Sequence, residues 1–321
     1  MRDSVWTIAV IALAALAGCA TDSAVQGAAS PYLVVLGTAQ DGGLPHLGCQ
    51  RACCEAARTD PRRRRLVASL LIVDPIAKTR WLIDATPDIR EQESLIRVHP
   101  AARSTAGGRD PLVDGIFLTH AHMGHVAGLL QFGREAMASR DVPVFAGPRM
   151  GMFLRDQEPW KLLIEARHID VRPLNPGSDV RLSESVSVTP ITVPHRDEFS
   201  ETFGFVVALG KHRALYIPDI DKWERWDRNL RDEVAKVDIA LLDGTFFADG
   251  EIPGRAMRDI PHPFVDETLT LMATWPEAER KKVVFTHLNH TNPLAQGSTA
   301  ALASVQSRGG RIAAEGEIIR P

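Results

Sequence analysis

Three histidines lie within six positions at the end of an apolar segment, in the sequence FLTHAHMGH over residues 117–125. Imidazole is the side chain that most often binds metals in proteins. His120 and His122 lie two positions apart in a loop that leaves a predicted strand, so both can turn toward one ion. In a chain with 11 histidines, chance produces this spacing on the order of 0.01 times. The motif therefore indicates a metal site, but two ligands do not complete one.

Other polar side chains follow apolar segments, each just past the end of a predicted strand. They are Asp84, His195, Asp219, Asp243 and His287. Loops at one rim of a rigid sheet commonly carry binding and catalytic residues. We expect His195, in the sequence VPHRD, to supply the third ligand of the ion that His120 and His122 bind.

The elements that must position these residues follow from the apolar periodicity. Predicted strands span 32–37, 66–74, 80–84, 115–119, 142–146, 186–193, 203–209, 213–217, 238–242, 282–286 and 311–319. Predicted helices span 149–156, 159–167, 222–235, 263–275 and 294–308. Helices occur in both halves without regular strand–helix alternation. This favours an α/β (α+β mixed) fold of two mixed β-sheets with helices outside over a doubly wound parallel sheet.

The N-terminal segment has the pattern of a secretion signal. Arg2 precedes an apolar stretch over 5–17, which is short for a bilayer-spanning helix. The stretch ends in LAGC, which resembles the lipobox of bacterial lipoproteins and implies lipidation of Cys19. Ordinary secretory cleavage and an uncleaved anchor are the alternatives.

These features predict three regions in the chain: a signal peptide at 1–18, a flexible tether at 19–30 and one domain at 31–321. The protein would be exported and anchored by lipid to a bacterial membrane, facing the periplasm or the exterior. Its net charge of -3 gives no general attraction to nucleic acid, and the basic run at 62–65 fits a solvated turn. We expect a small-molecule substrate and no nucleic-acid partner.

The remaining cysteines are Cys49, Cys53 and Cys54, in the sequence HLGCQRACC. With His46 they could form a small Cys/His zinc site. The alternative is one local disulfide with a free thiol, since three thiols cannot all pair internally and an exported protein permits disulfides. The residues alone leave both open.

The order of these motifs resembles the metallo-β-lactamase superfamily across 31–321. That family has an Asp after an early strand, His-x-His-x-Asp-His, a lone His, a lone Asp and a final His. The chain offers, in this order, Asp84, HAHMGH, His195, Asp219 and His287. The resemblance implies a four-layer αββα sandwich and a first metal held by His120, His122 and His195. It implies a second metal held by His125 and His287, with Asp219 bridging both ions.

Gly124 stands where the superfamily has an aspartate that binds the second metal and orients the attacking water. Three outcomes are open. The chain could bind one metal, could hold the second weakly, or could use a nearby carboxylate such as Asp197 or Asp221. We expect at least one catalytic ion, Zn²⁺ or alternatively Fe or Mn.

Within the superfamily, four segments resemble the pyrroloquinoline quinone biosynthesis protein B branch and its phosphodiesterase relatives. They are LGTAQDGGLPHLGCQRACC, LIDATPDIR, LLDGTFF and HLNHTNP. That branch binds a structural zinc through a cysteine cluster after the first strand, which implies an additional Zn²⁺ on Cys49, Cys53 and Cys54. The spacing differs from the usual Cys-x-Cys-x-x-Cys, so either His46 or His290 could be the fourth ligand.

The expected chemistry is hydrolysis, because a metal with three histidines and an open position lowers the pKa of bound water toward 7. Asp219 would be catalytic through the metals it bridges. His262, just before the predicted helix at 263–275, matches a histidine of superfamily phosphodiesterases. It is a candidate general acid or phosphate ligand, or simply a turn residue. Asp84 and Asp243 would brace the metal ligands through hydrogen bonds.

Three functions follow from this reading. The first is a metal-dependent hydrolase of a phosphodiester, ester or lactone. The second is a metal-dependent oxidative step of quinone cofactor biosynthesis, as the branch resemblance implies. The third, prompted by Gly124, is a metal-binding lipoprotein without catalysis.

Overall fold

Apolar side chains of the central strands alternate between two cores, as β1 (Tyr32–Gly37) shows. Leu33 and Val35 face a core between two sheets, whereas Val34 and Leu36 pack in a second core with helices. Strands buried on both faces read as continuous apolar runs. This is why short apolar runs located the strands but did not show which face meets which layer.

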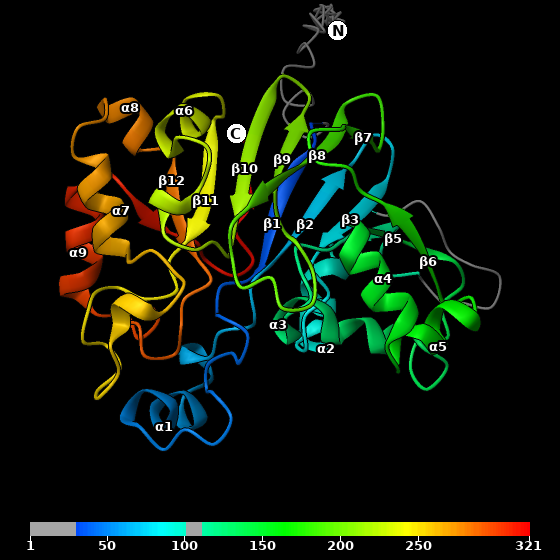
Figure 1. Cartoon of the computed structure of the whole chain (residues 1–321), viewed down its shortest axis with the longest axis horizontal. Coiled ribbons are helices and arrows are strands. Elements are labelled where there is room, and N and C mark those ends of the chain that lie inside the picture. Colours follow the sequence, from blue (N-terminus) through cyan, green and yellow to red (C-terminus); the bar gives the residue numbers. More distant parts are fainter. Residues whose placement is uncertain (1–29, 101–110) are drawn as a thin grey trace, which may run out of the picture.

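The computed structural model describes residues 30–100 and 111–321 (Figure 1). The predicted signal peptide, Cys19 and the predicted tether up to residue 29 lie outside the described residues. Within the described ranges, no helix is long and apolar enough to cross a membrane.

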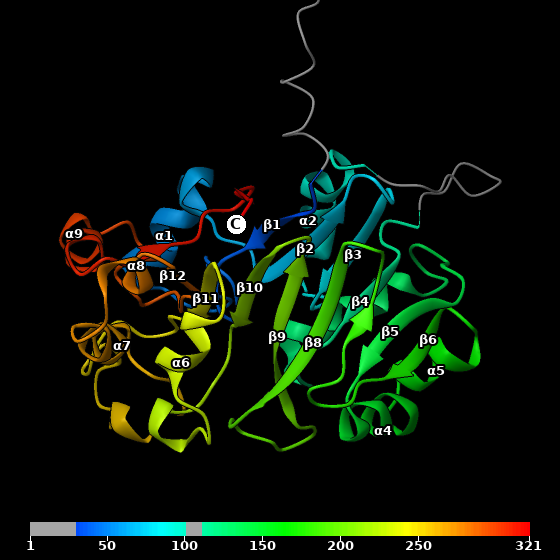
Figure 2. The same cartoon turned by 90° about the horizontal axis from the view of Figure 1, so that it is seen from above.

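Two seven-stranded mixed sheets form the centre of the molecule (Figures 1 and 2). In spatial order, the first sheet contains β14 (Ile318–Ile319), β1, β2 (Ser69–Asp74), β3 (Thr79–Ile83), β4 (Gly115–Phe117), β5 (Val142–Ala146) and β6 (Ile169–Pro173). The second contains β13 (Arg311–Ile312), β12 (Val283–Thr286), β11 (Ile239–Asp243), β10 (His212–Ile217), β9 (Thr202–Leu209), β8 (Val186–Val193) and β7 (Val180–Arg181). Each sheet joins antiparallel strands at one side to parallel strands at the other.

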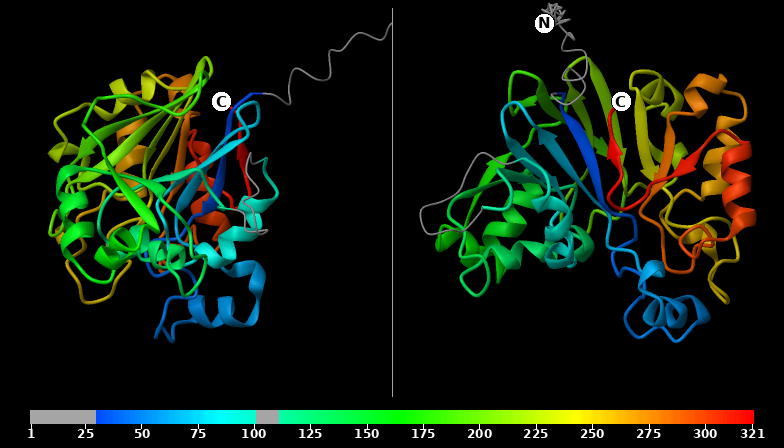
Figure 3. Two further views of the ribbon diagram at one scale, coloured as in Figure 1. Left: turned by 90° about the vertical axis from the view of Figure 1, so that its right-hand side faces the viewer. Right: turned by 180° about the vertical axis from the view of Figure 1, so that it is seen from behind.

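Helices cover the outer face of each sheet. Those packed on the first sheet are α2 (Ile89–Arg97), α4 (Pro148–Asp156) and α5 (Trp160–Glu165), with the four-residue α3 (Met123–Val126) nearby. Those on the second are α6 (Leu230–Ala235), α7 (Val265–Met272) and α9 (Thr299–Ser307), with α8 (Glu277–Arg280) beside α6. The helix α1 (Ala52–Thr59) projects from one end of the molecule (Figures 1 and 3). The predicted four-layer αββα sandwich is confirmed.

Local capping explains where several helices differ from their predicted ranges. The predicted helix 222–235 is a 3₁₀ turn at Trp223–Arg225 followed by α6, because the Asn229 side chain accepts a hydrogen bond from the Asp232 amide and starts a new helix. The predicted helix 294–308 begins only at Thr299, where Ser298 is the N-cap. The short helices α1 and α2 were not predicted.

The predicted strand 311–319 is wrong in an informative way, because it is two strands in different sheets. β13 pairs with β12, and β14 pairs with β1. Gly316, at φ 77°, makes the turn between them. A single apolar stretch near the C-terminus therefore links the two sheets.

Candidate metal centre

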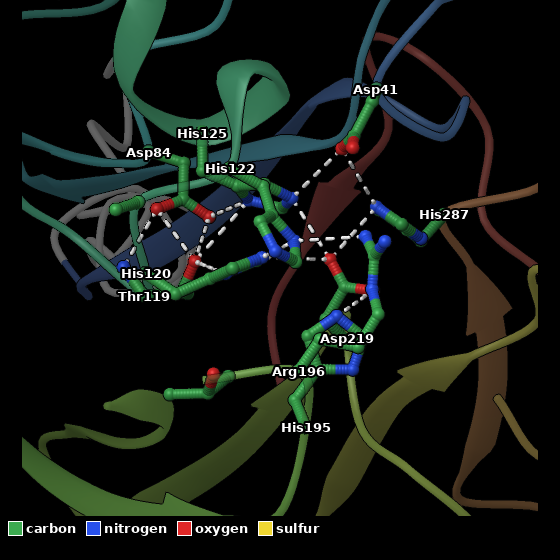
Figure 4. A network of polar contacts seen from close by, with 12 residues as sticks. Asp41, Asp84, Thr119, His120, His122, His125, His195, Arg196, Asp219 and His287 are labelled. Atoms are coloured by element: carbon green, nitrogen blue, oxygen red, sulfur yellow. Dashed lines mark hydrogen bonds and ion pairs between the residues drawn. The ribbon is translucent and has the colours of Figure 1, made fainter. Parts of the chain in front are cut away.

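The first predicted ligand group is assembled at the rim where the two sheets meet (Figure 4). His120 and His122 follow β4, and His195 follows β8. One nitrogen from each of the three rings lies within 4.8 Å of the others, and His120 Nε2 is 2.8 Å from His122 Nδ1. The other ring nitrogen of His122 lies 3.0 Å from Glu198 Oε2. The structure thus brings together the three side chains predicted to hold the first ion.

Asp219 lies between this group and a second one. Its Oδ2 is 2.9 Å from His125 Nε2 and 3.1 Å from His287 Nε2, and its Oδ1 is 3.7 Å from His195 Nε2. Although burial alone would raise the pKa of Asp219, His287 and His195 hold it well below the usual range. The carboxylate is thus an anion placed to contact both groups, as the resemblance implies.

The second group contains a carboxylate that sequence reasoning missed. Donor atoms of Asp41, His125, Asp219 and His287 lie within 4.8 Å of one another. Asp41 follows β1 in the sequence AQDGG, so its position just past an apolar strand was the signal that could have found it. Its side chain points at His125 and His287 in Figure 4.

The two carboxylates named as possible substitutes at Gly124 bond to other residues. Asp197 accepts a hydrogen bond from the Thr202 hydroxyl, and Asp221 accepts one from Arg225. Neither belongs to the ligand groups formed by the described residues. Of the three outcomes left open, the one in which Asp197 or Asp221 fills the place is therefore wrong, since both side chains are bonded to residues close to them in sequence.

Asp84 sets the proton positions of two of the histidines. The Thr119 hydroxyl donates to Asp84, so its lone pair accepts from His120 Nδ1 at 3.0 Å. His125 Nδ1 donates to Asp84 Oδ2 at 2.7 Å. With Nδ1 engaged in this way, each ring directs Nε2 into the site, where it binds a cation once it carries no proton. Asp84 holds this position with a positive φ of 66°.

Asp243 repeats this arrangement from the second sheet. The Thr245 hydroxyl donates to Asp243, and so accepts from His287 Nδ1 at 2.9 Å, leaving His287 Nε2 bare. His262 Nδ1 donates to the other oxygen of Asp243 at 2.8 Å. Although burial alone lowers the pKa of His262, Asp243 raises it. Asp84 and Asp243 thus occupy the bracing positions predicted from the sequence.

Buried donor atoms without hydrogen bonds test whether this set fits a metal. Such atoms among the described residues include Asp41 Oδ1, His125 Nε2, His287 Nε2 and both ring nitrogens of His195. Leaving a buried polar atom unsatisfied costs about 1–3 kcal/mol. These atoms belong to residues of the two ligand groups. A cation in the second group would satisfy Asp41 Oδ1, His125 Nε2 and His287 Nε2, and one in the first group would satisfy one ring nitrogen of His195. The residues fit a metal.

Protonation of His120 and His195 agrees with this conclusion. Burial lowers the pKa of His120 well below its ordinary value and that of His195 to about 4, so both rings are neutral near pH 7. For His125, burial opposes a proton, but Asp84, Asp219 and Asp41 together raise its pKa. The carboxylates that attract a proton to His125 attract a metal cation in the same way, so metal and proton compete there.

The cysteines form a separate cluster with His290. The distance between the sulfurs of Cys53 and Cys54 is 3.9 Å, and Cys54 Sγ lies 3.5 Å from His290 Nδ1. Tetrahedral zinc requires about 3.8 Å between sulfurs and about 3.5 Å between sulfur and nitrogen, given the usual bond lengths. Cys49 completes the group of four. The cluster therefore has the dimensions of a zinc site.

The alternatives left open for the cysteines can now be compared. Cys49, Cys53 and Cys54 are all free, so the local disulfide is not formed. The His46 ring packs against that of His290 at a tilt, with ring centroids 4.6 Å apart, but its Nδ1 bonds to the Leu47 carbonyl. Burial raises the pKa of the Cys54 thiol to about 12, so a thiolate there needs a cation beside it. His290 is the fourth member of the group.

Comparison with known proteins identifies the class. Residues 79–288 match the model of the beta-lactamase superfamily domain. Because this match spans most of the chain, the protein belongs to the beta-lactamase superfamily.

Two relatives within this superfamily are similar to the chain over most of its length. The chain is 27% identical to coenzyme PQQ synthesis protein B of Methylorubrum extorquens (strain PA1), over 89% of this chain and 98% of that protein. It is 26% identical to the protein of the same name from Xanthomonas campestris pv. campestris (strain B100), over 88% and 98%.

Solved structures support the same fold. Zn²⁺-bound PqqB from Methylobacterium extorquens superposes with a TM-score of 0.75 at 23% identity, covering 90% of this chain and all of that one. A diphosphatase of the PhnP family gives a TM-score of 0.64 at 21% identity, covering 90% and 96%.

The cysteine cluster generates a direct prediction. Cys54→Ser and His290→Ala should each remove about one zinc per chain and lower Tm by roughly 5 °C or more, because a structural zinc contributes to folding stability. Elemental analysis and thermal unfolding of protein purified without added metal measure both. His46→Ala is the matched control and should keep the zinc. Equal zinc loss in His46→Ala and His290→Ala would contradict the assignment of His290.

Proposed function

We propose that the protein is a metal-dependent hydrolase acting on a small-molecule phosphodiester, ester or lactone, with zinc as its ion. The observation that carries this proposal is the convergence of two ligand groups on Asp219, from loops of both sheets. When bound, the ions would supply an activated water near neutral pH and polarise the bond that it attacks. Binding of zinc by the PqqB structure of similar fold supports the choice of metal.

The chain's own residues would orient and protonate the substrate. His262 is buried, tied to Asp243 through Nδ1, and belongs to a third group with His195 and Asp219. Its Nδ1 also lies 3.5 Å from Asp219 Oδ1, so the ring is beside the ligand groups, and its other nitrogen would act as the general acid toward a leaving group. Arg196 Nη2 lies 3.4 Å from His122 Nδ1, and its other terminal nitrogen pairs with Glu198 at 3.8 Å. If an anionic phosphodiester displaced Glu198, this guanidinium would bind it.

A second candidate is a metal-dependent oxidative step in the synthesis of a quinone cofactor. The similarity to coenzyme PQQ synthesis proteins over most of the chain favours it. Metal content separates the two: zinc with hydrolysis supports the first, and iron with oxygen consumption supports the second. The third reading, a binding protein without catalysis, rested on Gly124 and loses that basis because Asp41 brings a carboxylate to the same place.

His122→Ala tests the metal centre. It should remove about one ion per chain and lower kcat/KM by more than about 100-fold, since even the outer hydrogen-bonding partners of metal ligands contribute 10–100-fold. Elemental analysis and a panel of bis(p-nitrophenyl) phosphate, p-nitrophenyl acetate and a lactone give the two readings. The control is His212→Ala, a histidine beside Asp238 and away from the site. Unchanged metal and activity in His122→Ala would refute the site.

His262→Gln tests the general acid. We expect kcat to fall by about 10²–10⁴-fold with metal content unchanged. The loss should be larger for substrates with alkyl leaving groups than for p-nitrophenyl ones, because p-nitrophenolate leaves without a proton. Equal losses for both substrate types would exclude the acid role, and loss of an ion would instead make His262 a ligand.

We also propose that the chain is exported and anchored to a membrane by lipid on Cys19, on the basis of the LAGC segment. The full-length protein expressed in bacteria should incorporate labelled palmitate and sediment with membranes. Cys19→Ser should abolish the labelling. Equal labelling of both proteins would exclude lipidation at this residue.

A further inference from the structure

We propose that Asp41 is the carboxylate ligand of the second ion and that residue 124 is glycine because Asp41 occupies the space a side chain would need. The carboxylate that the superfamily places on the histidine motif would thus come from the loop after β1. This deepens the metal-dependent function proposed above, on which it rests for the presence of an ion.

The space around Gly124 is the first observation. A Cβ at this residue would lie 2.3 Å from Asp41 Oδ1 and 2.7 Å from Asp41 Cα, distances that real Cβ atoms do not adopt. Gly124 lies in α3 and has no positive φ, so backbone conformation does not require glycine there. The requirement is steric, and both the carboxylate and the backbone of Asp41 impose it.

The direction of the Asp41 side chain is the second observation. Asp41 Oδ1 lies 3.2 Å from His125 Nε2 and 3.7 Å from His287 Nε2 (Figure 4). The same oxygen is buried and has no hydrogen bond among the described residues. A buried carboxylate oxygen aimed at two imidazole nitrogens is arranged to share a cation with them.

The charges of the second ligand group also favour Asp41 as a ligand. With neutral imidazoles, the second group would carry one negative charge from Asp219 alone, and Asp219 is shared with the first group. Asp41 adds a carboxylate that belongs to the second group alone, so an ion there would face two carboxylates and two neutral rings. Asp41 thereby replaces the charge that Gly124 lacks.

Backbone hydrogen bonds hold Asp41 in place relative to His287. The Gln40 amide donates to the Leu288 carbonyl at 3.0 Å, and the Leu288 amide donates to the Thr38 carbonyl at 2.7 Å. The residues adjacent to Asp41 and His287 are thus paired with each other's segment. This pairing preorganises the carboxylate, so that binding an ion does not have to order the loop.

Metal content of Asp41 variants tests the proposal. Asp41→Asn and Asp41→Ala should each lose about one ion per chain relative to the unaltered protein, after purification without added metal and gel filtration. Asp197→Asn is the matched control, because it removes a carboxylate from the same rim outside the ligand groups. Circular dichroism and the retained cysteine-site zinc verify folding. Unchanged ion content in folded Asp41→Asn and Asp41→Ala would overturn the proposal.

Exchanging the residues at 41 and 124 tests the second part of the proposal, that Asp41 occupies the space which a side chain at residue 124 would need. Gly124→Asp alone should destabilise the protein, whereas Asp41→Gly combined with Gly124→Asp should bind more metal than Asp41→Gly alone. A small shift of the loop is needed in the double variant, because the Cα of residue 41 remains 2.7 Å from the new Cβ. If the folded double variant binds no more metal than Asp41→Gly, the claim that a carboxylate at residue 124 can replace that of Asp41 is wrong.

The metal readout separates this inference from the hydrolase proposal. Loss of an ion in Asp41→Asn, in a protein that hydrolyses none of the panel, would support the ligand and reject the hydrolase. Hydrolysis by the unaltered protein, together with full ion content in Asp41→Asn, would support the hydrolase and reject Asp41 as a ligand.

Discussion

The site depends on one buried carboxylate, that of Asp219, which is 2% exposed and surrounded by imidazole rings. An ionised carboxylate removed from water is strongly unfavourable unless charges and hydrogen bonds compensate it. Here, loops after strands of both sheets deliver that compensation to the same point. Two sheets facing across one core are needed to present these loops from opposite sides, which links the four-layer architecture directly to the chemistry.

In each sheet, an aspartate and a threonine orient the histidines of the site through hydrogen bonds. Asp84 and Thr119 orient His120 and His125 from the first sheet, while Asp243 and Thr245 orient His287 and His262 from the second. Fixing the tautomer in this way leaves a bare nitrogen toward the ion without any rearrangement on binding. Asp84 and His287 adopt positive φ angles, of 66° and 60°, so backbone strain accompanies this placement.

Much of this arrangement could be predicted from the sequence. The strands β1, β5 and β8 match their predicted ranges, because short apolar runs ended by turn residues report burial directly. Helix starts were predicted less well, since side-chain caps such as Ser298 decide them locally. The stretch 311–319 was assigned to one strand because a pattern of apolar residues does not reveal which sheet each half will join.

By itself, the sequence determined the histidines of the site, the residue Asp219 between them and the membership of a superfamily, because these depend on residue type, order and spacing. Only the tertiary structure decided which carboxylate compensates for Gly124 and which histidine joins the cysteines. Asp41 and His290 reach their groups from segments distant in sequence. The reason for a glycine at residue 124 is visible only in the folded chain, where Asp41 fills the space of its missing side chain. Contacts of this kind are steric, and they exist only once the chain has folded.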